Sequence, residues 1–133
     1  MIKTINVEFG IFGEKEFIEI DENLYKYIFD SLKWANSYYN KKMTVKGINL
    51  KGDTYFDKNG MEELRGIIKA WIEIFSYSPE NFILYGDYNL EDNAYQENSF
   101  IKKNILSQLK ELTEKIDEAN LKNELLVCTI ENY

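Results

Sequence analysis

The hydrophobic pattern of the chain is most pronounced between Gly60 and Tyr88. Apolar residues recur there every three or four positions, which is the period of a helix, and they spread widely around its circumference: Leu64, Ile67, Ile68, Trp71, Ile72, Ile74 and Phe75. We expect such a helix to be buried on more than one side. Asp57 can cap its start, Pro79 follows its end, and residues 82–85 are predicted to form a short buried strand. This helix and strand are the predicted centre of one hydrophobic core.

The residues before this helix predict a hairpin, a helix and a weaker strand. Alternating apolar positions with a turn near Gly13 predict a β-hairpin over residues 4–20. Apolar residues at helical spacing then predict a helix over residues 22–38. Residues 44–50 are a weaker strand candidate, and residues 51–59 are predicted to form a polar loop or short hairpin.

The residues after residue 85 predict an acidic loop, a helix and a final strand. Residues 86–98 are polar and acidic, which predicts the loop. A helix that Asn98 or Ser99 can cap follows, with one apolar face made of Ile101, Ile105, Leu109, Leu112, Ile116 and Ala119. The apolar run over residues 125–130 predicts a strand in the centre of the sheet.

The predicted order of elements is therefore β-β-α-β-α-β-α-β. This order, without a linker or an internal repeat, predicts one α+β domain over residues 1–133. We expect a mixed sheet of about five strands packed with three helices.

The charge of the chain indicates the class of partner that it can bind. Twenty-three acidic residues against sixteen basic ones give a net charge of −7. Such a surface repels nucleic-acid phosphate and anionic membranes, so we expect direct binding to neither. It attracts a basic protein, although an acidic surface also serves solubility alone.

The chemical inventory is short. The chain has no histidine, which excludes Ser-His-Asp and Cys-His arrangements and the usual zinc sites with histidine ligands. Its one cysteine, Cys128, lies in an apolar run and is expected to be an unreactive core thiol in a reducing compartment. The N-terminal residues lack the apolar core of a signal peptide, and we expect a cytoplasmic protein. We predict no catalytic residue, metal or cofactor.

Two groups of carboxylates leave an enzymatic alternative open. Asp53 with Asp87, or Asp87 with Glu91 and Asp92, could pair to hold a metal ion or to exchange protons, as in a small metal-dependent hydrolase. The other interpretation of these residues is a solvated acidic loop.

The segment DYNLEDNAYQE, residues 87–97, carries four acidic residues, two tyrosines and no basic residue. Carboxylates that attract Arg and Lys, interleaved with rings that supply contact area, suit docking onto a positively charged protein. The alternative is a surface loop whose tyrosines pack back onto the core. The predicted partner-binding residues are Asp87, Tyr88, Glu91, Asp92, Tyr95 and Glu97, joined by Asp53 and Glu62 if the fold brings the two acidic stretches together.

The central stretch resembles a known class of bacterial proteins. Its segments GMEELR, AWIEIF, PENF and GDY are similar to those of immunity proteins of polymorphic-toxin systems, typified by the partners of contact-dependent growth inhibition toxins. Because immunity proteins do not share one fold, the resemblance implies a role and no particular site. That role is to bind and neutralise the C-terminal domain of a cognate toxin, often a nuclease with a basic cleft. An acidic adaptor or regulatory subunit for another basic protein remains the alternative among binding proteins.

Overall fold

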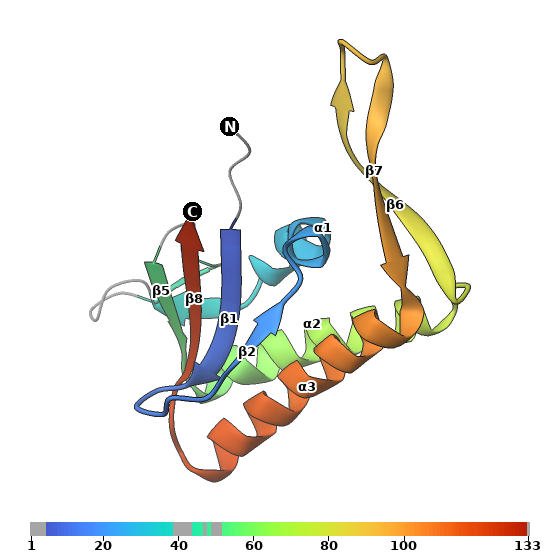
Figure 1. Cartoon of the computed structure of the whole chain (residues 1–133). Coiled ribbons are helices and arrows are strands. Elements are labelled where there is room, and N and C mark those ends of the chain that lie inside the picture. Colours follow the sequence, from blue (N-terminus) through green and yellow to red (C-terminus); the bar gives the residue numbers. More distant parts are fainter. Residues whose placement is uncertain (1–4, 39–43, 47, 49–51, 133) are drawn as a thin grey trace.

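The computed structural model describes residues 5–38, 44–46, 48 and 52–132 (Figure 1). The α+β class predicted from the sequence is confirmed, with three helices separated by strands. In chain order the elements are β1 (Ile5–Ile11), β2 (Phe17–Ile20), α1 (Glu22–Leu32), β3 (Asn36–Tyr38), β4 (Thr44–Lys46), β5 (Gly52–Phe56), α2 (Lys58–Ser76), β6 (Asn81–Asn89), β7 (Ala94–Ile101), α3 (Lys102–Leu121) and β8 (Leu126–Asn132).

The larger sheet has six strands in the order β2-β1-β8-β5-β3-β4. The hairpin of β1 and β2 and the central place of the last strand agree with the sequence. The sheet is antiparallel at each described pairing, whereas a mixed sheet was expected, because β8 returns between β1 and β5 and runs opposite to both. Residues 47, 49 and 50 of the predicted strand, and residue 51 of the predicted loop, lie outside the described residues.

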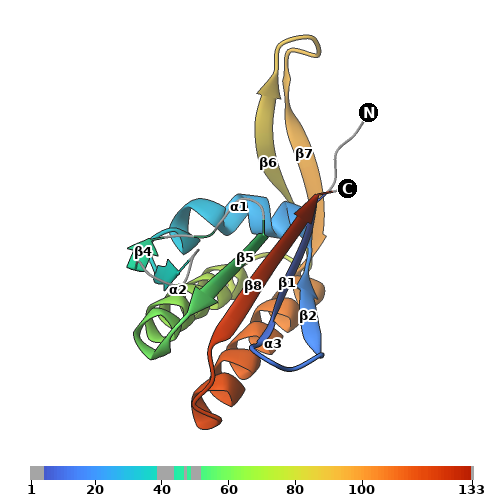
Figure 2. The ribbon, with the colours of Figure 1, turned by 90° about the vertical axis from the view of Figure 1, so that its left-hand side faces the viewer.

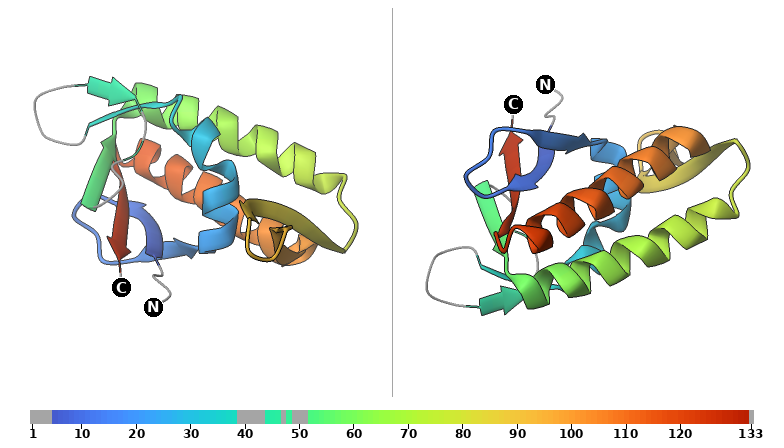
Figure 3. Two further views of the ribbon diagram at one scale, coloured as in Figure 1. Left: turned by 90° about the horizontal axis from the view of Figure 1, so that it is seen from above. Right: turned by 90° about the horizontal axis from the view of Figure 1, so that it is seen from below.

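The helices pack on one face of this sheet (Figure 2). Seen from above and below, α2 and α3 lie side by side across that face (Figure 3). Apolar side chains at alternate positions of β1 and β8 point toward the helices and join one core, among them Val7, Phe9 and Ile11 with Leu126 and Cys128. Within the described residues, none of the three helices covers the opposite face of the sheet (Figure 2).

The predicted central helix is α2. The carboxylate of Asp57 caps it, because its Oδ1 accepts a hydrogen bond of 2.9 Å from the backbone N–H of Gly60. A Cβ atom at Gly60 would collide with the carbonyl oxygen of Asn36, so glycine allows β3 to approach the helix. Farther along, Arg65 forms a bidentate ion pair with Asp117 of α3, at 2.7 and 3.2 Å.

Two predicted segments differ in the first half of the chain. The helix expected over residues 22–38 ends at Leu32, and Asn36–Tyr38 forms β3 instead. Asn, Ser and Tyr are weak helix formers, and pairing with β4 and β5 satisfies their backbone. The polar loop expected over residues 51–59 contains β5, whose Thr54 and Phe56 are fully buried.

A third difference concerns the start of the last helix. Asn98 and Ser99 do not cap it, because both lie within β7, and α3 begins at Lys102 without a side-chain cap. The backbone N–H of Lys102 instead donates a 2.9 Å hydrogen bond to the carbonyl oxygen of Glu80. This bond closes the base of a second, two-stranded sheet formed by β6 and β7.

We call this second sheet, with its connecting turn, the arm (residues 81–101). It stands away from the body of the protein at the end where α2 stops and α3 starts (Figure 1). The strand predicted over residues 82–85 is found within the longer β6, but only Phe82 and Leu84 of it pack against the core. The loop predicted over residues 86–98 is wrong, because most of these residues continue β6 and β7. Residues on both faces of the outer arm are exposed, so this part of the chain lacks the alternation of apolar and polar residues that marks a strand.

Candidate protein-binding surface

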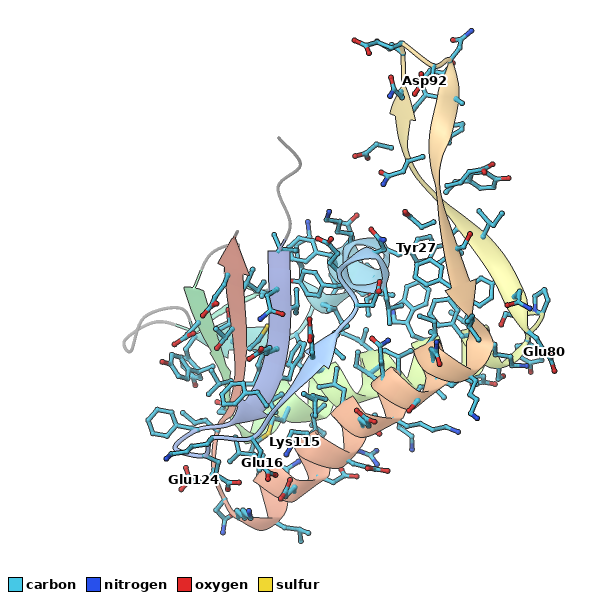
Figure 4. The ribbon with its side chains drawn as sticks, in the orientation of Figure 1. Glu16, Tyr27, Glu80, Asp92, Lys115 and Glu124 are labelled. Carbon is cyan, nitrogen blue, oxygen red and sulfur yellow. The ribbon has the colours of Figure 1, made fainter. Side chains whose placement is uncertain are left out.

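The arm is fixed to the body by a column of aromatic rings. Trp71 and Phe75 of α2, Phe82 of β6 and Phe100 of β7 follow one another with ring centroids 5.5, 5.9 and 5.7 Å apart, and each pair is close to parallel. Tyr27 of α1 contacts Trp71 from the side, at 5.7 Å (Figure 4). The base of the arm therefore belongs to the hydrophobic core, although its outer part does not.

A β-bulge sets the direction of the tyrosines on the arm. Tyr85 lies opposite Glu97 and Tyr88 lies opposite Tyr95, so three steps along β6 match two steps along β7. In a regular strand Tyr85 and Tyr88 would face opposite sides, and the extra residue brings them to the same side. The ring of Tyr95 accordingly contacts both, at 6.3 Å from Tyr85 and 4.9 Å from Tyr88.

These tyrosines do not pack back onto the core. Tyr88 keeps 45% of its surface exposed and Tyr95 keeps 58%, and each packs its ring against another tyrosine of the arm. Of the two sequence interpretations of residues 87–97, the structure thus contradicts the one in which the rings tuck inward. The arm carries an exposed aromatic face.

The turn at the end of the arm is ordered by side-chain hydrogen bonds. The side chain of Asn89 accepts a 2.9 Å hydrogen bond from the backbone N–H of Glu91. Asn93 adopts a left-handed conformation (φ 56°), and its side chain accepts a 2.6 Å bond from the hydroxyl of Tyr88. This turn holds Asp92 at the end of the arm that is far from the body (Figure 4), and Glu91 precedes it in the same turn.

Five of the predicted partner-binding residues surround one shallow hollow of about 660 Å³ at this end of the arm: Asp87, Tyr88, Glu91, Asp92 and Tyr95. The sequence has no Lys or Arg between Lys69 and Lys102. Within the described part of the chain, the ion pairs include none of the arm's carboxylates. Their negative charge is therefore available to a cation from outside.

The other three predicted residues separate into two groups. Glu97 lies on the arm, directly across from Tyr85. Asp53 lies on β5, where it accepts a 2.9 Å hydrogen bond from the hydroxyl of Thr129. Glu62 lies near the start of α2, about 20 Å along the helix from the end that carries the arm. Asp53 and Glu62 consequently do not extend the acidic surface of the arm.

The distance between Asp53 and the arm also excludes one of the carboxylate pairs that the sequence offered for an enzyme. Asp53 lies on β5 and Asp87 on β6 of the arm, and these strands stand on opposite sides of the molecule (Figure 1), so the two carboxylates do not meet. Among the described residues there is no group of three or more His, Cys, Asp or Glu side chains placed to hold a metal ion. Cys128 is fully buried, as expected, and burial, reinforced by the charge of Asp53, raises the pKa of its thiol far above the ordinary value.

Sequence reasoning missed three exposed side chains of the arm. Tyr85 (61% exposed) completes the tyrosine cluster, Ile83 lies on the same face nearer the body, and Leu90 is exposed in the turn. The alternation of residues 82–85 contains the signal for the first two. Phe82 and Leu84 turn inward, so Ile83 and Tyr85 turn outward.

No helix in the described residues is both long enough and apolar enough to cross a membrane. We compared the chain with models of protein families, with curated proteins and with solved structures. None of the three comparisons found a match.

Proposed function

We propose that this protein neutralises a cognate bacterial toxin domain by binding it one to one through the outer part of the arm. The toxin domain is a basic protein, and a nuclease with a phosphate-binding cleft fits this description best. The inhibitor works in the cytoplasm, where such a toxin would meet its substrate. The single observation that supports the proposal most is the arm itself, with its exposed tyrosine cluster and with carboxylates that form no ion pair among the described residues.

Charge supports the choice of a basic partner. Asp87, Glu91, Asp92 and Glu97 lie within one hairpin that has no basic residue. Opposite potentials on two proteins raise the association rate, to about 10⁸ M⁻¹s⁻¹ or more at low salt. Fast capture suits an inhibitor that has to act before the toxin does.

The tyrosines support a protein partner over a small cation. Tyr85, Tyr88 and Tyr95 together offer an exposed aromatic surface, in which the ring of Tyr95 contacts the other two edge to face. Rings held in this way lose little conformational entropy on binding, and tyrosine is enriched among the residues that dominate binding energy at interfaces. The projection of the arm allows these rings and carboxylates to enter a cleft.

The test is co-expression with the C-terminal domain of the protein that the neighbouring gene encodes, which the proposal expects to be the toxin. We expect a 1:1 complex on size-exclusion chromatography with light scattering, and protection of growth when the toxin domain is induced. Failure to form this complex, with both proteins folded, would contradict the proposal of immunity.

A shortened arm tests which surface carries the activity. In this variant a two-residue Asn-Gly turn replaces residues 86–96, which removes the tip and leaves the aromatic column in place. We expect it to fold like the wild type by circular dichroism and to give no protection. Full protection by the shortened protein would show that another surface binds the toxin.

A further inference from the structure

The face of the large sheet that the helices leave open carries a row of apolar and aromatic side chains. The strand register places Tyr38, Tyr55 and Val127 side by side across three strands. This row continues to Phe17 of β2, whose ring lies over Gly10 of β1. Such a row is ordinarily the inner surface of a packed sheet. Here it lies on the outer side, because Leu126 and Cys128 of β8 point into the core and Val127 between them points away from it.

At one end of this row lies a pocket of about 360 Å³, lined by Phe12, Tyr38, Tyr55, Asp57 and Leu125. This volume is at the lower end of the range of small ligand sites, roughly 300–1,000 Å³. Its walls are held in place by direct contacts. The ring of Phe12 meets that of Tyr55 edge to face at 6.0 Å, and the backbone N–H of Phe12 donates a 2.9 Å hydrogen bond to the carbonyl oxygen of Leu125.

The charge in the pocket is negative and fixed. Asp57 accepts hydrogen bonds from the backbone N–H of Gly60 and from the hydroxyl of Tyr38, at 2.9 and 2.7 Å. These hydrogen bonds hold the pKa of Asp57 below its usual value, and the bond from Gly60 has a larger effect than the bond from Tyr38. The carboxylate is therefore ionised at neutral pH. Burial, then the charge of Asp53, raises the pKa of Tyr55, so its phenol stays neutral.

We propose that this pocket binds an arginine side chain from a protein partner. A guanidinium group is flat, stacks on aromatic faces and is attracted by a carboxylate, and its aliphatic stem packs on apolar walls. Phe12, Tyr38 and Tyr55 supply the faces, Leu125 supplies an apolar wall and Asp57 supplies the charge. An anionic ligand would meet repulsion from Asp57, and a purely apolar ligand would take water away from that carboxylate without supplying an opposite charge.

This site is separate from the arm. Leu125 follows Glu124, and Glu124 and Asp92 lie at opposite ends of the molecule (Figure 4). The pocket is therefore free to engage a different part of a bound protein, or a second partner, while the arm is occupied. A result that contradicts the arginine site therefore leaves the proposed toxin inhibition unaffected, and a result that contradicts toxin inhibition leaves the arginine site unaffected.

The test uses N-acetyl-arginine amide as the probe and the aromatic NMR signals of the whole protein as the readout. We expect saturable shifts of the Phe12, Tyr38 and Tyr55 ring signals, with affinity of about millimolar strength for one isolated side chain. N-acetyl-norleucine amide, which has a stem of similar size without the charge, is expected to bind about fivefold more weakly. Equal binding of the two amides, or no shift of these rings, would overturn the proposal.

Asp57→Asn separates the role of the charge from the role of the fold. Asparagine caps helices as well as aspartate does, so this variant keeps the helix start and loses the negative charge. Its amide nitrogen takes the place of the oxygen that accepts from the Tyr38 hydroxyl, and it can donate a hydrogen bond to that hydroxyl instead. We expect it to bind the arginine probe about fivefold more weakly. Asp92→Asn, which removes a carboxylate from the distant tip of the arm, is expected to leave probe binding unchanged. If Asp57→Asn binds the probe as well as the wild type does, the pocket does not recognise a cation.

Discussion

Tyr88 and Tyr95 lie opposite each other near the end of the arm, with ring centroids 4.9 Å apart and ring planes at 73°. Tyr95 also contacts Tyr85, so it stands between the two tyrosines of the other strand. The cluster depends on the bulge, because without the extra residue the two β6 rings would point to opposite sides. The exposed aromatic face is thus a consequence of strand register.

Tyr95→Ala should weaken binding of the toxin domain by at least about tenfold, because it removes the ring that organises the other two. The melting temperature should change little, since Tyr95 is 58% exposed and its ring contacts are within the arm. Calorimetric titration measures the affinity. Tyr77→Ala is the matched control, because Tyr77 is 81% exposed and lies off the arm. Equal losses in the two variants would mean that the cluster is not the contact surface.

Asp92→Lys should slow association with the toxin domain by about fivefold at low salt and reduce the dependence of the rate on salt. Dissociation should change less, because steering acts on the encounter. Stopped-flow or surface-based kinetics at several salt concentrations measure both rates. Glu111→Lys makes the same change in net charge on the exposed side of α3 and should leave association nearly unaltered. Identical slowing by both substitutions would point to net charge alone.

Phe82→Ala should loosen the arm at its base. Phe82 stacks between Phe75 and Phe100, so its loss interrupts the aromatic column that joins the arm to the body. We expect a loss of about 2 kcal/mol in the free energy of unfolding, less than for a fully buried phenylalanine. Hydrogen exchange should quicken in β6 and β7 while β1 and β8 stay protected. Uniformly faster exchange would show that the arm and the sheet unfold together.

The charge of Asp57 should contribute its full stabilisation above the pH at which this residue titrates in the unfolded chain, and progressively less below it. Its pKa is lowered in the folded protein from the usual 3.8, chiefly by the hydrogen bond from Gly60, so folding favours the ionised form. The wild type should exceed Asp57→Asn by about 0.5 kcal/mol near neutral pH, from the favourable charge at a helix N-terminus. This advantage should vanish as the pH falls through the folded-state pKa, as urea unfolding at several pH values would reveal. A difference that stays constant down to pH 2 would contradict this assignment.

The sequence predicts those helices and strands that have one face buried in the core and the other face exposed to solvent. The helix with Leu64 and Ile68 inside, the strand with Val7 and Phe9 inside, and the apolar last strand were all found near their expected positions. Burial on one face produces a periodic pattern, and such a pattern can be read from a single chain. The cap at Asp57 was equally visible, because capping is local.

The outer arm and the contacts within it could not be predicted from the sequence, because they depend on pairing between residues that are distant along the chain. The outer arm is exposed on both faces, so no hydrophobic period marks it as a strand, and only pairing between residues such as Tyr85 and Glu97 defines it. The acidic tip was recognised from composition, whereas the contact between Tyr85 and Tyr95 depends on a bulge that no residue type announces. The distance between Asp53 and the arm is likewise a property of the tertiary fold.

The attachment of the arm through its base alone has a consequence for how this protein can diversify. Its inward-facing anchors are Phe82, Leu84 and Phe100, and beyond them the hairpin meets mostly solvent. Exchanges of residues at the tip, or the gain and loss of paired residues there, leave the helix packing and the six-stranded sheet untouched. The same body can therefore carry many different tip sequences, each suited to a different binding partner, with little loss of folding stability.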